Sequence, residues 1–577
     1  MTALIGEVTR PSAPRSRPSR RSRAIFELKA AGLRLRRAAL EFGHAPPRLP
    51  RAADAGLGQI VAQSVTPLWA DPSLAEQAMQ LGKVQNLRRA AAALDGLVMA
   101  PGQVFSFWRH VGQATRRRGY VPGRMLREGC MVAAVGGGLC QLSNALYDVA
   151  LRTGCRIVER HAHSRRVPGS AAESGRDATV AWNYVDLRFA ASRPLRLSVK
   201  LGARDLTVSL LARDAAPGPA TGADDRPILA PGLRDAASCG SCDQTDCFLH
   251  EHRLGPAMVG RAAFLVDEFW PELADYVAGA HRPDDAIGAA DFRRWAADGF
   301  AQVYAAPLPG VLRGLAWRLT PPQGAARRSA DARSTARIAA ALARRLPTDI
   351  TEVCVAQSLL PYLWRDGALG GRRFRVLMTR LPMAVLEARL DEAFREHPGR
   401  RTLADYRADA ALAEAEAEAL AAADEVITPH AEIAALFGDR ALRLDWRRPA
   451  APLTSPSPGR VFAFPGPTVA RKGAFELREA ARRLGATVRP LGAELEGPGF
   501  WSGVSTDRPD AAWLDSVRAV VHPALAEGAP RRLLEALAAG VPVIATEACG
   551  LTPQPGLVLV PIGDVEALAV AMADLNG

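Results

Sequence analysis

The segment Gly136–Ser143 limits how this chain can fold more than any other stretch. It reads Gly-Gly-Gly-Leu-Cys-Gln-Leu-Ser, and three adjacent glycines allow an abrupt turn through backbone angles that other residues rarely adopt. Apolar residues then recur at the helical positions i, i+3, i+4 and i+7, at Leu142, Ala145, Leu146 and Val149. The sequence therefore predicts a tight turn that runs directly into an amphipathic helix.

The cysteine of this segment is predicted at the start of that helix, where free N–H groups and the helix dipole favour a thiolate. Downstream, a predicted strand places two histidines on one face, because side chains alternate along a strand, and polar residues beyond it can orient an imidazole. The candidate catalytic residues of an activated thiol are therefore Cys140, His161, His163 and Asp177. Gln141 is a candidate oxyanion donor. The alternative is that Cys140 is a small buried residue beneath a tight turn.

Four blocks around this cysteine carry a family resemblance. They are Pro101–Trp108, Gly136–Ser143, Glu159–Ser164 and Gly175–Thr179. In this order they resemble the VanW family, which is named for an accessory protein of vancomycin-resistance clusters. The resemblance implies an α+β domain over residues 51–212 of a bacterial protein that works on the cell envelope or on peptidoglycan precursors. It identifies a domain and leaves its reaction open.

The net charge of +13 is concentrated in residues 1–50, which hold 11 of the 73 basic residues and only 3 of the 60 acidic ones. We expect a disordered basic leader, with a basic helix-like segment around Ile25–Phe42, that contacts an anionic membrane surface or an acidic partner. The alternative is a solvated tail without function. Because the charge is local, no nucleic-acid partner is expected. The chain has neither a long apolar run nor an apolar signal core, which predicts a cytoplasmic protein, peripheral at the inner membrane face.

A linker rich in Pro, Gly, Ala and Asp is predicted over residues 213–254, and it ends in a cluster of cysteine and histidine. The candidate metal ligands are Cys239, Cys242, Cys247 and His250. Soft thiolates and an imidazole at this density suit Zn²⁺ or an iron–sulfur cluster. The metal interpretation lacks the second C-x2-C pair that such sites usually have. The alternatives are a thiol redox pair and a purely structural role.

From about residue 255 onward, apolar strands alternate with helices rich in Ala and Arg, which predicts parallel α/β structure. A break rich in Pro and Ser over 449–459 separates two Rossmann-like units, at 255–448 and 460–577. Within the second unit, Phe464–Gly473 and the E-x7-E spacing of Glu527–Glu535 resemble the donor domain of GT-B glycosyltransferases, family four. The expected fold is therefore multidomain α/β, with an N-terminal α+β domain followed by two Rossmann-like units in GT-B arrangement.

This second resemblance implies a retaining glycosyltransferase that uses a UDP- or GDP-sugar as the donor, with residues 255–448 as the acceptor unit. Basic side chains at Arg471 and Lys472 suit the diphosphate, whose charge grows as it leaves. Backbone N–H groups near Gly528, at a predicted helix start, can bind the same phosphates. The resemblance assigns the donor sugar's hydroxyls to Glu527 and the ribose hydroxyls to Glu535. Alternatively, both glutamates are solvated helix residues.

The leading interpretation is a VanW-family protein with a nucleotide-sugar-dependent glycosyltransferase module, which acts on a glycan or lipid-linked acceptor in cell-envelope synthesis. One alternative is a thiol-dependent amidase or acyltransferase centred on Cys140, with the C-terminal half as a targeting module. Another is a non-enzymatic scaffold of envelope synthesis. Tyr362 and Trp364 are candidates for lining an acceptor cleft, and His430 is a weak candidate for a catalytic residue.

Overall fold

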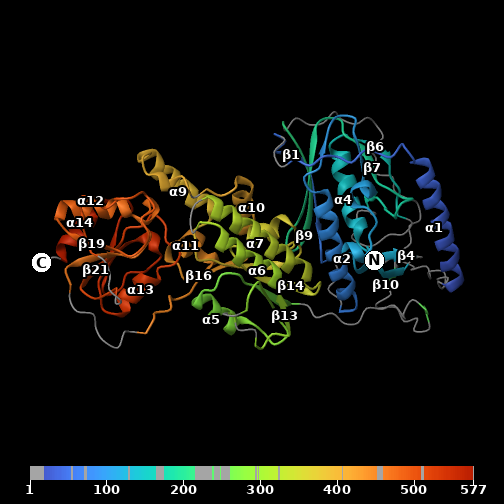
Figure 1. Ribbon diagram of the computed structural model, residues 1–577. Helices are drawn as coiled ribbons and strands as arrows, with labels where there is room; N and C mark the ends of the chain where they lie inside the picture. The colour runs from blue at the N-terminus through green and yellow to red at the C-terminus, as the bar shows by residue number, and fades with distance from the viewer. Residues whose placement is uncertain are drawn as a thin grey trace, which may run out of the picture. The chain divides into compact units, whose positions relative to one another are not determined.

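The computed structural model divides into two compact units, Met1–Val259 and Gly260–Gly577, called here the N-terminal and C-terminal units (Figure 1). The residues that it describes are 19–52, 56–69, 74–127, 130–163, 174–214, 237–238, 247–248, 260–292, 295, 298–321, 325–405, 407–450, 459–507 and 513–575.

The N-terminal unit is built on a four-stranded antiparallel sheet, in the order β1-β9-β8-β2. Side chains of β8 alternate between buried and partly exposed, so one face of the sheet packs on the core. The helices α2 (Leu74–Leu94) and α4 (Leu139–Arg152) contact this sheet. The strands are β1 (Gln59–Pro67), β2 (Val98–Met99), β8 (Leu195–Leu201) and β9 (Asp205–Ala212).

Two small sheets complete the N-terminal unit, in the orders β3-β7-β6 and β10-β5-β4. Along the chain, a short helix, α3 (Phe107–Val111), and the 3₁₀ turn η1 (Arg116–Arg118) lie between β3 and β4. The strands are β3 (Val104–Ser106), β4 (Pro122–Arg127), β5 (Cys130–Val135), β6 (Arg156–Glu159), β7 (Arg188–Ala190) and β10 (Ala237–Ser238). The expected α+β class of this unit is confirmed.

The helix α1 (Arg20–Leu40) lies within the leader that was expected to be disordered. It begins at a capping box, in which the Ser19 side chain and backbone bond with Ser22. Arg37 near its end donates two hydrogen bonds to Glu159 on β6, at 3.0 and 2.6 Å. A helix lies where the helix-like segment was expected, but the leader is ordered from residue 19 onward, because these ion pairs fix the helix to the domain. Residues 1–18 lie outside the described residues.

The first half of the C-terminal unit, called the first subdomain, contains a seven-stranded parallel sheet in the order β13-β12-β11-β14-β15-β16-β17. Its strands are β11 (Arg261–Leu265), β12 (Ala286–Ala289), β13 (Gln302–Ala305), β14 (Ile350–Ala356), β15 (Arg373–Leu377), β16 (Glu425–Thr428) and β17 (Ala441–Arg443). The intervening helices are α5 (Pro271–Ala280), α6 (Pro307–Leu319), α7 (Ala325–Arg345), α8 (Leu360–Arg365), α9 (Met383–Glu396), α10 (Ala410–Ala422) and α11 (Ala431–Phe437).

The second subdomain contains a six-stranded parallel sheet in the order β20-β19-β18-β21-β22-β23. Its strands are β18 (Val461–Phe464), β19 (Thr487–Pro490), β20 (Ser505–Thr506), β21 (Val517–His522), β22 (Val543–Thr546) and β23 (Leu557–Val560). Its helices are α12 (Ala474–Leu484), α13 (Arg531–Ala538) and α14 (Val565–Asp574). The second sheet has the strand order 3-2-1-4-5-6 of a Rossmann fold, and the first has the same order with a seventh strand, β17, added at its edge. The two expected Rossmann-like units are therefore confirmed. Each helix of the described residues is too short or too polar to cross a membrane.

Candidate functional site

Cys140 lies in the first turn of α4, directly after the glycine turn. The turn ends at Gly138, whose φ of 99° is favourable for glycine and which forms the N-cap of the helix. The Cys140 side chain is partly exposed. Because the first N–H groups of a helix have no partner within it, the thiol lies beside backbone donors and at the positive end of the helix dipole.

The glycine turn is held in place by close packing against α2 and β4. A Cβ on Gly137 would lie 2.2 Å from the carbonyl oxygen of Gly123, so no larger residue fits there. Asn86 on α2, fully buried, donates through its side-chain amide to the carbonyl oxygens of Gly137 at 2.8 Å and Val121 at 3.0 Å. These contacts fix the start of α4, and with it the position of Cys140.

His163 links Cys140 to Asp177. The His163 Nδ1 atom lies 2.7 Å from Asp177 Oδ2, and the His163 backbone N–H donates to the same oxygen at 2.6 Å. The His163 imidazole also hydrogen-bonds the Cys140 thiol. Since Nδ1 is paired with the carboxylate, Nε2 is the nitrogen left for the sulfur. The three side chains thus form one chain of hydrogen bonds, the arrangement of an activated nucleophile.

The electrostatics of this cluster favour a charged pair. Burial raises the pKa of the Cys140 thiol, but the hydrogen bond and charge of His163 and the backbone N–H of Val180 outweigh it, so the pKa falls below its ordinary value. Burial lowers the pKa of His163, whereas its bonds to Asp177 and Cys140 raise it more, to about 9. Both pKa shifts are therefore in the direction that favours a thiolate beside an imidazolium.

Asp177 is itself fixed by several contacts. Arg160 donates to the Asp177 carboxylate at 2.8 Å and to its backbone carbonyl at 2.8 Å. The next residue, Ala178, is tied to α4, because its N–H donates to Asn144 Oδ1 at 2.8 Å and its carbonyl accepts from Ser143 Oγ at 2.5 Å. The segment that carries the carboxylate is thus anchored on the helix that carries the thiol.

Two residues from the same motifs lie outside this cluster. The His161 side chain is half exposed, and its Nε2 lies 3.4 Å from Glu159 Oε1. Gln141 donates both amide hydrogens to β1, to Thr66 Oγ1 at 2.9 Å and to the Pro67 carbonyl at 2.9 Å. The expectation that Gln141 serves as an oxyanion donor is wrong, because the sheet already occupies its amide. The Gln141 N–H donates to the Gly138 carbonyl oxygen at 3.1 Å, so the candidate donors of the first turn are the N–H groups of Leu139 and Cys140.

A second cluster, of buried charges, lies at the carboxyl ends of β18 and β21. Lys472 Nζ is 2.6 Å from Glu527 Oε2, and His522 Nε2 is 2.8 Å from the same oxygen. Lys472 and His522 are 7% and 1% exposed. The strand order of the second subdomain reverses between β18 and β21, and ligands of open α/β sheets bind in the crevice at such a reversal.

Mutual stabilisation keeps the Glu527 carboxylate ionised. Burial raises the pKa of Glu527, but the charge of Lys472 and the hydrogen bond of His522 lower it more, to well below its ordinary value. Burial lowers the pKa of His522 and of Lys472 by more than the Glu527 carboxylate raises them. The second Glu527 oxygen, Oε1, accepts from the Ala529 N–H at 2.8 Å.

The remaining predicted donor residues are close to this cluster in the chain. Arg471 and Glu535 are partly exposed, the former beside Lys472 and the latter on α13. Gly528 lies three residues before α13 begins at Arg531, and a Cβ there would lie 2.9 Å from the Thr379 carbonyl oxygen of the first subdomain. The N-cap of α13 is Pro530, which has no N–H to offer a phosphate.

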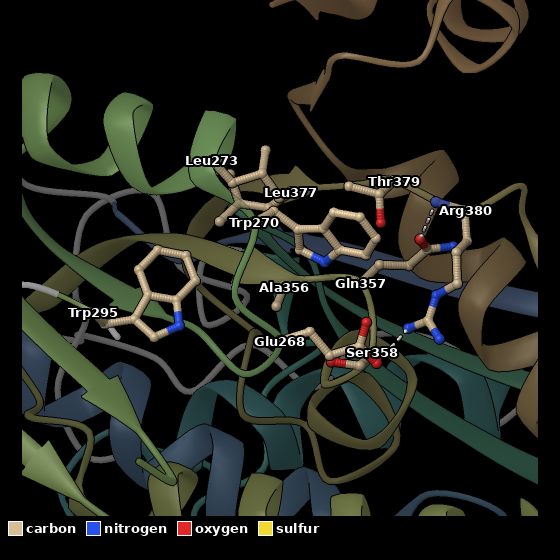
Figure 2. Close-up of a pocket in the computed structure, with 10 residues that line it drawn as sticks. All are labelled: Glu268, Trp270, Leu273, Trp295, Ala356, Gln357, Ser358, Leu377, Thr379 and Arg380. Carbon is tan, nitrogen blue, oxygen red and sulfur yellow. Dashed lines mark hydrogen bonds and ion pairs between the residues drawn. The ribbon is translucent and has the colours of Figure 1, made fainter. Parts of the chain in front are cut away.

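A cleft in the first subdomain was missed by sequence reasoning (Figure 2). It encloses about 300 Å³, its open mouth included, and its lining residues come largely after β11, β14 and β15, where the strand order again reverses. Figure 2 shows the Arg380 guanidinium pointing toward the Glu268 carboxylate, 3.2 Å away. The cleft is lined by Glu268, Trp270, Leu273, Trp295, Ala356, Gln357, Ser358, Leu377, Thr379 and Arg380. Polar residues that directly follow short apolar strands were the available signal.

The candidate acceptor-cleft residues and the candidate catalytic histidine of the first subdomain lie outside the cleft. Tyr362 and Trp364 lie on α8 and pack against the core of the first subdomain, outside the cleft. His430 is 1% exposed, caps α11 and hydrogen-bonds the Glu527 carbonyl oxygen at 3.0 Å, so it connects the two subdomains. Its burial and its structural bonds explain its place without a catalytic role.

The predicted metal ligands fall almost entirely outside the described residues. This holds for Cys239, Cys242 and His250, whereas Cys247 is described and partly exposed. Within the part of the chain that the structure describes, no group of three or more metal-binding side chains comes together.

Comparisons with known proteins identify two domains. Residues 82–211 match the family model described as VanW like protein, and residues 482–576 match that of glycosyl transferases, group 1. An uncharacterised Bacillus subtilis protein, YoaR, is 36% identical over 131 residues, which are 22% of this chain and 43% of that protein. The vancomycin B-type resistance protein VanW of Enterococcus faecalis is 39% identical over 112 residues, 19% of this chain and 41% of that protein. The chain thus spans less than half the length of each of these relatives.

Solved structures similar to the chain include a sucrose-phosphate synthase from Thermosynechococcus elongatus, with 14% identity and a TM-score of 0.38, covering 55% of this chain and 89% of that one. Another is HepE of Anabaena in complex with UDP, with 15% identity and a TM-score of 0.32, covering 54% and 89%. The family models confirm both sequence resemblances. The chain carries a VanW-like domain followed by a glycosyltransferase group 1 domain.

Proposed function

We propose that the C-terminal unit transfers a sugar from a nucleotide-sugar donor to a glycan or lipid-linked acceptor in cell-envelope synthesis. One observation carries this proposal. The buried Lys472–Glu527 pair lies at the strand-order reversal of the second subdomain, and Glu527 belongs to the segment that matches glycosyl transferases group 1. A diphosphate that enters this crevice meets a desolvated cation where charge stabilisation is strongest.

Different side chains bind different parts of the donor in this proposal. Lys472 and the adjacent Arg471 neutralise the diphosphate of a UDP- or GDP-sugar as it leaves. Because Glu527 balances the Lys472 ammonium, a bound diphosphate competes for the ammonium and releases Glu527 toward the hydroxyls of the sugar. Glu535 on α13 binds the ribose hydroxyls. Gly528 lets its loop pass close to Thr379, next to the cleft of the first subdomain.

The cleft of the first subdomain is the proposed acceptor site. Trp270, which is partly buried, supplies an indole face for a sugar ring, while Glu268 and Arg380 supply charged groups for its hydroxyls or for an anionic group. Retention of the anomeric configuration follows from the family-four resemblance and is part of the proposal.

An exposed apolar face on α6 supports a lipid-linked acceptor. No residue of this helix is buried, and the exposed apolar positions follow the helical repeat. They are Leu308, Val311, Leu312, Leu315 and Leu319. Exposed arginines lie on the same helix and on its neighbour α7, at Arg318, Arg333 and Arg337. Apolar and basic surface together suit the interface of an anionic membrane. The proposed location is therefore cytoplasmic, peripheral at the inner membrane face.

Thermal unfolding of the full chain with UDP, GDP and their sugars tests the donor site. A nucleotide at 100 times its Kd stabilises a binding domain by about 2.7 kcal/mol, or roughly 5 °C or more. We expect one nucleotide to raise Tm in the wild type and to lose this effect in Glu535→Ala. The matched control is Glu547→Ala, because Glu547 is exposed in the same subdomain. The absence of a shift with every nucleotide would overturn the proposal.

A further inference from the structure

We propose that Cys140, His163 and Asp177 form a second catalytic centre, which transfers acyl groups through a thioester on Cys140. Its substrates are amides or esters of carboxylic acids. The proposal rests on the hydrogen-bond chain from thiol to imidazole to carboxylate, on the anchoring of that carboxylate by Arg160, and on the position of Cys140, a partly exposed residue, at a helix start. Neither the glycosyltransferase domain nor its proposed reaction uses these residues.

A packing role does not account for this arrangement. A cysteine that only fills space needs no partner for its thiol, and the buried Cys354 is an example, since burial raises its pKa to about 12. Cys140 instead has an imidazole and a backbone N–H directed at its sulfur, which together lower its pKa. The Asp177 carboxylate is 3% exposed, and holding a charge at such burial is costly without a cationic partner. The imidazolium and Arg160 supply that charge.

The chemistry balances with water as the second reactant. The Cys140 thiolate attacks the carbonyl carbon, and the backbone N–H groups of the first turn of α4 stabilise the oxygen that becomes negative. His163 gives its Nε2 proton to the leaving amine or alkoxide as the C–N or C–O bond breaks, which leaves a thioester. His163 then takes a proton from water, whose oxygen attacks the thioester. The C–S bond breaks, the carboxylic acid leaves and the thiolate is restored.

Asp177 and Arg160 are positioning residues in this centre. Asp177 accepts from both the ring and the backbone of His163, which fixes the ring orientation and keeps Nε2 toward the sulfur. Arg160 contacts the carboxylate opposite the histidine and also lies over the Tyr147 ring on α4, 5.1 Å from its centroid. The pair acts on the substrate only through His163.

Alkylation of the full chain by iodoacetamide at pH 6, followed peptide by peptide by mass spectrometry, tests the thiolate. Cys130, also partly exposed, is the internal control. We expect Cys140 to react at least about tenfold faster than Cys130, because the thiolate is the reactive form. His163→Ala should remove this advantage, whereas His161→Ala should preserve it. Equal rates for the two cysteines, or an equal effect of the two histidine substitutions, would overturn the proposal.

Acyl transfer is tested with p-nitrophenyl acetate. We expect a burst of p-nitrophenol and an acetyl group on the Cys140 peptide of the wild type, and neither in Cys140→Ser. Melting curves of every variant establish that it is folded. A reactive Cys140 that never carries the acetyl group would refute the acyl-transfer step. Nucleotide binding by the C-terminal unit is read separately, so failure here and failure of the glycosyltransferase proposal are distinguishable.

Discussion

The Lys472 ammonium and the Glu527 carboxylate lie 2.6 Å apart, although 55 positions separate them in the chain. Lys472 follows β18 and Glu527 follows β21, so the parallel sheet brings their two loops to the same edge of the sheet. Each charge is buried and each is the main partner of the other. The pair is therefore both a structural requirement of the unliganded crevice and a proposed point of exchange with the donor diphosphate.

Removal of only one member of this pair is expected to be costly. Lys472→Ala leaves the buried Glu527 carboxylate with His522 and the Ala529 N–H but no lysine, so we expect the C-terminal unit to lose about 3 kcal/mol of unfolding free energy. Denaturant unfolding, followed by tryptophan fluorescence, measures the change. The double variant Lys472→Met/Glu527→Leu should recover most of it, because no unpaired charge remains. A loss below about 1 kcal/mol in the single variant would contradict the argument.

The glycine turn makes a separate prediction, about packing. Gly137→Ala would place a Cβ 2.2 Å from the Gly123 carbonyl oxygen, so β4 or α4 must move. We expect a loss of about 1–3 kcal/mol in the N-terminal unit, together with slower alkylation of Cys140, because the start of α4 shifts. Gly58→Ala is the control, since a Cβ there meets nothing within 4 Å. Equal melting temperatures for the two variants would count against the packing argument.

Membrane binding by α6 is tested by co-sedimentation with vesicles of phosphatidylglycerol or phosphatidylcholine. We expect binding to the anionic vesicles and a loss of about tenfold or more in Val311→Asp/Leu315→Asp, because both residues lie on the exposed apolar face. Val570→Asp is the matched control, since Val570 is 52% exposed on α14, away from this face. Unchanged sedimentation of the double variant would exclude α6 as the contact.

The position of Cys140 could be predicted from sequence because its causes are local. Three glycines and a helical repeat specify a turn and a helix start without any distant contact. The choice between His161 and His163 could not be made, since the two-residue repeat places both on one face. Both lie beyond the end of β6 at Glu159, and the Asp177 segment, anchored on α4, selects His163. Such a choice needs tertiary structure.

Other features that the sequence did not predict also depend on contacts between residues that are distant in the chain. The Arg-rich composition of the leader predicted disorder, yet ion pairs to distant residues such as Glu159 attach α1. Lys472 and Glu527 were each assigned to a ligand, and nothing in the sequence indicated that they pair with each other. The cleft around Trp270 and Glu268 was missed because its residues are scattered over separate strand ends. Sheet order, which brings those ends together, was not predicted strand by strand.

The bond between His163 and Asp177 predicts a pH-dependent stability. The His163 pKa is raised from 6.5 to about 9, so the bond stabilises the folded state fully below pH 6.5 and loses this contribution as pH rises through about 9. Asp177→Asn removes the carboxylate that raises the pKa. We therefore expect the wild type to exceed this variant in melting temperature by an amount that shrinks between pH 6.5 and 9.5. Asp148→Asn is the control, because Asp148 pairs with Arg152 and Arg176 and contacts no histidine in the described residues. A difference in melting temperature that stays constant over this range would show that the Asp177 carboxylate does not raise the pKa of His163.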